Sequence, residues 1–79
     1  MTRKVYHLVH RNADGRWHLT LDGSDAAAFE TKEDALAEGE NIGRGLWRKG
    51  QPAQLVIHRQ DGSIEREFTY GNDPRDVPG

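Results

Sequence analysis

One segment of the 79-residue chain, Thr31 to Gly50, has the length and the periodicity of a substantial α-helix. Thr31 can cap its N-terminus by accepting a hydrogen bond from the backbone N–H of Asp34. Gly50 is a suitable residue to end the helix, and Pro52 prevents its continuation. Small or apolar residues recur at the spacing of one buried stripe, namely Ala35, Leu36, Gly39, Ile42, Gly43, Leu46 and Trp47. The rest of the chain must therefore pack against this stripe.

Four short segments with β-branched, aromatic and alternating apolar residues flank the helix. They are Val5–His10, Trp17–Asp22, Ala53–His58 and Ile64–Tyr70. Each pair encloses an Asp-Gly dipeptide, which favours a tight hairpin turn because glycine adopts positive φ without steric cost. We therefore predict two β-hairpins, one on each side of the helix.

The order β-β-α-β-β predicts an α+β fold in two layers, with one helix packed on one face of an antiparallel sheet of two hairpins. Residues 1–70 are expected to form a single domain, and residues 71–79 an irregular tail because their prolines exclude helix and central strand. Gly23–Ala28 is rich in small residues and is interpreted as a connecting loop. The sequence leaves open the strand order between the two hairpins.

Alternate residues of a strand face opposite sides of a sheet, so the apolar parity predicts the core. The expected core face consists of Tyr6, Leu8, His10, Trp17, Leu19, Leu21, Leu55, Ile57, Ile64 and Phe68, with Tyr70 as a further candidate. The outward face of the second hairpin is then Val56, His58, Glu65, Glu67 and Thr69, with His58 opposite Glu65. Arg66 falls on the core parity, and we expect it at a sheet edge with its stem buried and its charge in water.

Helix glycines are costly, since each destabilises a helix by about 0.5–1 kcal/mol relative to alanine. Gly39 and Gly43 lie on the buried stripe, and close packing against Trp17 or Phe68 is the expected compensation. Gly45 lies off the stripe and has no such explanation. A helix that ends or is distorted near Gly43 is an alternative that the sequence leaves open.

Composition excludes several classes of protein. The chain has no cysteine, which fits a reducing cytoplasm and rules out disulfides and thiolate metal sites. No window approaches the ~18 apolar residues of a membrane span, and the N-terminus has no apolar leader. The net charge of −2 supplies no long-range attraction for phosphate backbones. These features predict a cytoplasmic protein without a membrane segment.

Several short motifs occur in a characteristic order along the chain. They are Tyr6-His7-Leu8-Val9, Gly15-Arg16-Trp17, Thr31-Lys32-Glu33-Asp34-Ala35, Leu55-Val56-Ile57-His58, Asp61-Gly62-Ser63-Ile64 and Thr69-Tyr70-Gly71-Asn72-Asp73-Pro74. In order and spacing the chain resembles the small bacterial domain of unknown function 2188 family, from about Tyr6 to Pro74. It departs from the family at Gly39, Gly43 and Gly45, where similar proteins are usually richer in alanine. The resemblance implies a bacterial cytoplasmic setting and carries over no catalytic residue.

No catalytic constellation is recognisable in the sequence. There is no cysteine nucleophile, Gly-x-Ser-x-Gly elbow or phosphate loop, and a thin domain of this size can hardly enclose a water-excluded pocket. The four histidines lack metal-ligand spacing, and His7 and His10 on one strand point to opposite faces. We therefore predict that the protein is not an enzyme and binds no metal or cofactor.

The leading hypothesis is an interaction module that forms a homodimer or binds a protein partner. Its basis is the outward face of the sheet, which is half apolar, together with the end of the last strand and the tail. The residues of this predicted partner surface are Val5, His7, Val9, His18, Thr20, Val56, His58, Tyr70, Asn72 and Asp73.

The alternative hypothesis is a nucleic-acid-binding protein. Its candidate phosphate contacts are the basic residues of the N-terminus, the first hairpin and the helix end, namely Arg3, Lys4, Arg11, Arg16, Arg44, Arg48 and Lys49. Two observations weigh against it. The helix begins acidic and ends basic, which complements its dipole without any ligand. The aromatic residues fall on the helix-facing parity, whereas a sheet that binds RNA stacks bases on exposed aromatics.

Overall fold

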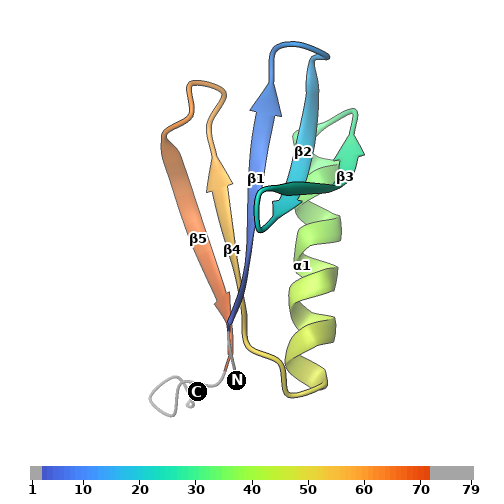
Figure 1. The fold of residues 1–79 in the computed structure, drawn as a ribbon, viewed down its shortest axis with the longest axis vertical. Helices are drawn as coiled ribbons and strands as arrows, with labels where there is room; N and C mark the ends of the chain where they lie inside the picture. Colours follow the sequence, from blue (N-terminus) through green and yellow to red (C-terminus); the bar gives the residue numbers. More distant parts are fainter. Residues whose placement is uncertain (1–2, 72–79) are drawn as a thin grey trace.

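A five-stranded sheet with one helix along one face makes up the fold (Figure 1). The computed structural model describes residues 3–71. Its elements are β1 (Lys4–Arg11), β2 (Arg16–Leu21), β3 (Ser24–Phe29), α1 (Lys32–Arg48), β4 (Ala53–His58) and β5 (Ile64–Tyr70). The predicted α+β class, with a helix packed on one face of a sheet, is confirmed.

The strand order is β3-β2-β1-β4-β5. Both predicted hairpins are present, since β1 pairs with β2 and β4 with β5 in antiparallel fashion. The two hairpins join through β1 and β4, which are parallel, so the sheet is mixed rather than antiparallel throughout. The reason is the crossover through α1, because a helical connection returns the chain to the same end of the sheet and gives the next strand the same direction.

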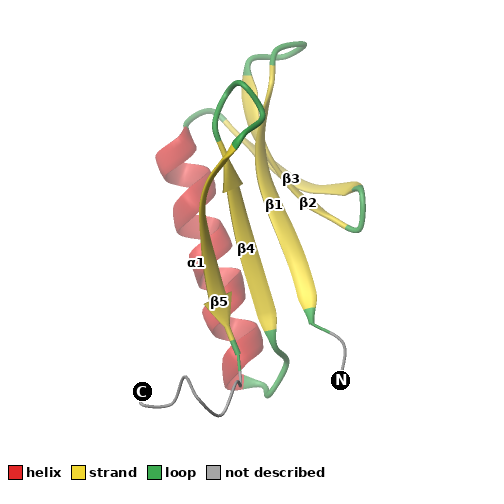
Figure 2. Ribbon diagram, turned by 90° about the vertical axis from the view of Figure 1, so that its left-hand side faces the viewer, coloured by secondary structure: helices red, strands yellow, loops and turns green. Residues whose placement is uncertain are grey.

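The prediction that Gly23–Ala28 is a connecting loop is wrong, because most of this segment belongs to the edge strand β3. It pairs with β2 across a two-residue turn at Asp22 and Gly23, both of which have positive φ (54° and 82°). This is the geometry that favours Asp-Gly in tight hairpins. The turn of the β2–β3 hairpin projects from the sheet on the side opposite α1 (Figure 2).

Helix α1 has the ends that the sequence predicts. The Thr31 hydroxyl accepts a hydrogen bond of 3.1 Å from the backbone N–H of Asp34. At the other end Gly50 has φ +84°, and the N–H groups of Gly50 and Gln51 donate to the carbonyls of Trp47 (2.9 Å) and Leu46 (2.8 Å). This is a Schellman motif, which closes a helix on glycine. The helix is therefore continuous past Gly43.

The core lies between α1 and the three central strands. Its buried side chains are Leu8, Trp17, Leu19, Ala35, Leu55 and Ile57. Gly39 and Gly43 do permit close packing, but against Leu55 and Tyr70 rather than against Trp17 or Phe68. A Cβ at position 39 would lie 3.0 Å from a Leu55 methyl, and one at position 43 would overlap the Tyr70 ring. Among residues 3–71, no side chain lies within 4 Å of the position that a Cβ at residue 45 would take.

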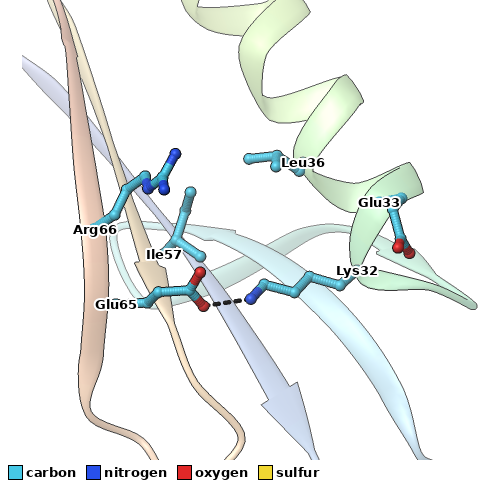
Figure 3. A pocket seen from close by; sticks show the side chains of 6 residues that line it. All are labelled: Lys32, Glu33, Leu36, Ile57, Glu65 and Arg66. Carbon is cyan, nitrogen blue, oxygen red and sulfur yellow. Dashed lines mark hydrogen bonds and ion pairs between the residues drawn. The ribbon is translucent and has the colours of Figure 1, made fainter.

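A β-bulge changes the end of the β4–β5 hairpin. Ile57 pairs with Arg66 as predicted, but His58 pairs with Ile64 instead of Glu65, so Glu65 is the extra residue. Two successive side chains, Glu65 and Arg66, therefore point toward α1 (Figure 3). The predictions that Glu65 faces outward and that Ile64 belongs to the core are wrong, and the Ile64 side chain is 52% exposed. Arg66 lies on the edge strand, as predicted.

Candidate functional site

The sheet face opposite α1 has no helix over it in residues 3–71, and only the turn of the β2–β3 hairpin projects on that side (Figure 2). Val5 and Val9 are half-buried on it, whereas Val56 is only 5% exposed. Ile64 joins this face because paired residues share one side of a sheet and its partner is His58. The open face is hereafter the surface formed by Val5, His7, Val9, Val56, His58 and Ile64.

Tyr70, Thr20 and His18 belong to the predicted partner surface but not to the open face. The Tyr70 ring packs against Gly43 of α1, on the opposite side of the sheet. Asn72 and Asp73 lie outside the described residues. Thr20 is 8% exposed, and its hydroxyl already approaches the His7 carbonyl oxygen at 3.5 Å. Little of this side chain is therefore available for contact with a partner protein.

A pair of histidines joins β1 and β4 at the centre of the open face. His7 Nδ1 lies 3.0 Å from His58 Nε2, and His58 Nδ1 lies 3.0 Å from the Gly62 carbonyl oxygen. A carbonyl only accepts, so His58 Nδ1 donates to Gly62 and its Nε2 is left to accept from His7. The two rings are thus hydrogen-bonded to each other and to the β4–β5 turn.

His18 belongs to the packing of the first hairpin and is only 7% exposed. Its Nε2 lies 2.8 Å from an Asp14 carboxylate oxygen, and its Nδ1 lies 3.4 Å from Asp25, which also accepts from Arg11 at 2.7 Å. The approach of Nδ1 to Asp25 lacks hydrogen-bond geometry. The Arg16 backbone N–H, followed by the His18 ring, lowers the pKa of Asp14. This network ties the β1–β2 turn to β3 and leaves His18 unavailable to a partner.

A groove of about 290 Å³ lies on the helix side, between the start of α1 and the β4–β5 hairpin (Figure 3). Its lining residues are Lys32, Glu33, Leu36, Ile57, Glu65 and Arg66. None of them is among the sequence-predicted site residues. The one available signal was Arg66, a cation at a position whose parity otherwise carries core residues.

Two cations, Lys32 and Arg66, and two anions, Glu33 and Glu65, line the groove. Lys32 Nζ donates to Glu65, and this hydrogen bond is the main reason that the pKa of Glu65 lies below its usual value. Lys32 also lies over the Trp17 ring, 5.7 Å from its centroid. Arg66 makes no ion pair within residues 3–71, and its guanidinium lies over the Phe68 ring at 5.6 Å. Arg66 and Glu33 are therefore the charged residues of the groove without an ion pair in that range.

A family model described as "Uncharacterized protein conserved in bacteria (DUF2188)" matches residues 6–70, which is most of the chain. The chain belongs to the DUF2188 family. The resemblance inferred from the sequence is thereby confirmed, and it brings no established function. Comparisons with curated proteins and with solved structures found no match.

The basic residues of this DUF2188 domain do not gather in one patch. Lys4 and Arg11 mark opposite ends of β1, which its eight residues place roughly 23 Å apart. Three of the predicted phosphate contacts are in ion pairs, Arg11 with Asp25, Arg16 with Glu30 and Arg44 with Glu40. The others are Arg3, Lys4, Arg48 and Lys49, for which no ion pair is found in the described part of the chain.

Two further properties concern residues 3–71 of the DUF2188 domain. No group of three or more histidine, aspartate or glutamate side chains is arranged to hold a metal ion there. No helix in that range is both long and apolar enough to cross a membrane.

Proposed function

We propose that this DUF2188 protein is a non-catalytic, cytoplasmic interaction module that forms a homodimer through its open face. The observation that carries the proposal is the one-sided covering of the central parallel pair β1–β4. Parallel strands are usually covered on both sides, and they then have continuous apolar runs. Strand β4 has such a run, Leu55-Val56-Ile57, of which only alternate residues face α1. A second layer on the open face would complete this arrangement.

Charge favours a second copy as the occupant. In a two-fold interface the same patch meets itself, so uncompensated like charges near the centre would repel. The centre of the open face consists of valines and the hydrogen-bonded histidine pair. Glu67, which pairs with Val56 on this side of the sheet, accepts a 2.6 Å hydrogen bond from Gln54, and Arg11 at the end of β1 is paired with Asp25. The Glu67 carboxylate keeps its charge, but it lies on the edge strand β5 and not on the central pair β1–β4.

Size indicates that the dimer is weak. The three strands that carry the open face, about 4.8 Å apart and each contributing about five residues of ~3.3 Å, present a face of roughly 240 Å². Two copies would bury about 500 Å² in total, below the range of stable specific interfaces. We therefore expect reversible self-association that depends on protein concentration.

Sedimentation velocity over roughly micromolar to millimolar concentrations tests the proposal. The described residues include two exposed large hydrophobic side chains, Ile64 on the open face and Trp47 on the last turn of α1 (44% exposed). Ile64→Lys should abolish the concentration-dependent rise in sedimentation coefficient, because it buries a cation against its own copy. Trp47→Lys, the matched control, should leave the rise unchanged.

A wild-type protein that stays monomeric throughout, or an equal response of the two variants, would contradict the proposal. Circular dichroism of each variant verifies that the fold is retained.

Nucleic-acid binding is the less supported alternative, because three of the candidate cations are ion-paired and Lys4 and Arg11 lie at opposite ends of β1. It predicts a shift of mixed DNA or RNA at low salt, since phosphate contacts strengthen as salt falls. A salt-dependent shift that Arg48→Gln weakens would favour it over the homodimer.

A further inference from the structure

We propose that the groove between α1 and β5 is a binding site for a small aliphatic carboxylate. Arg66 would hold the carboxylate group, and Leu36 and Ile57 would contact the aliphatic tail. The site lies on the helix side of the sheet, so it is separate from the open face and does not depend on dimer formation (Figure 3).

The β-bulge at Glu65 builds this groove. By adding one residue to β5, it turns Glu65 toward α1 next to Arg66, which regular alternation would not allow. Bulges of this kind often redirect a side chain at a functional site. The redirected Glu65 accepts a hydrogen bond from Lys32, and this bridge between α1 and β5 closes one end of the groove (Figure 3).

Arg66 supplies the recognition element. Its guanidinium makes no ion pair within the described part of the chain, and the Phe68 ring supports it from one side at 5.6 Å. Arginine presents a planar set of N–H donors that matches the two oxygens of a carboxylate. The neighbouring anion Glu65 already interacts with Lys32, and Glu33 lies at the opposite rim (Figure 3). The donors of Arg66 are therefore available to the carboxylate of a ligand.

The rest of the lining limits the ligand to a small and partly apolar acid. Ile57 is buried in the core at the base of the groove, and Leu36 projects from the second turn of α1. A volume of about 290 Å³ lies at the lower limit of ligand pockets, so a short branched chain fits better than a long or doubly charged one.

The test follows the amide NMR spectrum of the protein during titration with 4-methylpentanoate. We expect saturable shifts at Leu36, Ile57 and Arg66, with a dissociation constant on the order of 1 mM or tighter. The amide 4-methylpentanamide keeps the tail and lacks the charge, and acetate keeps the charge and lacks the tail. Each should bind about tenfold more weakly than the acid.

Variants assign the effect to the groove. Arg66→Gln should weaken binding of the acid about tenfold or more, and Arg66→Lys should have an intermediate effect because it keeps the charge but not the paired donors. Arg48→Gln removes an exposed cation on the last turn of α1, away from the groove, and should leave binding unchanged.

Three results would overturn the inference: no saturable shifts, equal binding of acid and amide, or full binding by Arg66→Gln. If Arg66→Gln loses its dispersed NMR spectrum, this variant is unfolded. Two measurements then test the role of Arg66: the comparison of acid with amide binding to the wild-type protein, and acid binding to Arg66→Lys.

Discussion

At the scale of single residues, the glycines of α1 show how closely the helix approaches the sheet. Tyr70 lies against the backbone at Gly43, and Leu55 lies against Gly39. Burial is the main cause that raises the pKa of the Tyr70 phenol, with the charge of Glu40 as a second cause. The absence of a side chain at position 43 therefore allows the last strand to dock on the helix.

This packing predicts opposite effects of two Gly→Ala substitutions in the same helix. Gly43→Ala should lower the free energy of unfolding by about 1–3 kcal/mol, because the new methyl group overlaps the Tyr70 ring. Gly45→Ala should raise it by about 0.5–1 kcal/mol, because nothing occupies the space around it and alanine favours helix. Urea denaturation of both variants measures the two effects. Stabilisation by both substitutions would show that Tyr70 does not pack on Gly43.

The sequence was sufficient to predict which residues are buried where strands alternate regularly. Leu8, Leu19, Leu55 and Ile57 are all at most 2% exposed, and each lies on the predicted core parity. Ile64 failed this prediction because the parity of a strand reverses at a bulge. The sequence also could not predict that Arg66 makes no ion pair within residues 3–71. This depends on its neighbour Glu65, which accepts a hydrogen bond from Lys32.

At the scale of elements, the Lys32–Glu65 hydrogen bond connects the start of α1 to the edge strand β5. It lowers the pKa of Glu65 in the folded state, so at pH values between the folded and unfolded pKa the unfolded chain binds more protons. The stability from this contact is therefore present above the ordinary glutamate pKa. It is lost as the pH falls through the folded-state pKa.

We accordingly expect Glu65→Gln to reduce the loss of thermal stability between about pH 5 and pH 3. Lys32→Met removes the main cause of the lowered Glu65 pKa. It should therefore also reduce the slope of thermal stability against pH over this range. Asp14 and Asp61 also have lowered pKa values, mainly through hydrogen bonds from Arg16 and Ser63, so part of the slope will remain. Thermal unfolding followed by circular dichroism measures it, and slopes identical to wild type in both variants would contradict the assignment.

The helix and four of the five strands were predictable because each is specified by its own residues. The Thr31 cap, the stripe of small and apolar residues and the terminal Gly50 specify α1. The β-branched segments around Asp-Gly turns specify the β1–β2 and β4–β5 hairpins. Strand β3 has only small residues and one phenylalanine, and its pairing with β2 determines its conformation. A third Asp-Gly, at Asp22 and Gly23, was the signal that could have revealed it. The parallel join of β1 and β4 depends on the path of the crossover, which leaves no local pattern.

At the scale of the whole molecule, the fold leaves two surfaces with different chemistry. The helix side has a groove lined by Arg66, which makes no ion pair within residues 3–71, whereas the opposite side has a half-apolar sheet face with a histidine pair at its centre. The outward parity predicted most of the open face, and the bulge added Ile64 to it. The groove could not be predicted, because it forms where the helix start meets a strand 33 residues later.

Isotope-filtered NOE spectroscopy on a mixture of labelled and unlabelled protein tests the central claim most directly, since it detects only contacts between copies. A homodimer through the open face predicts intermolecular NOEs from the methyl groups of Val5, Val9 and Ile64, and none from Leu36 in the groove. Intermolecular NOEs confined to α1 or to the groove, or no intermolecular NOE at millimolar concentration, would contradict the account.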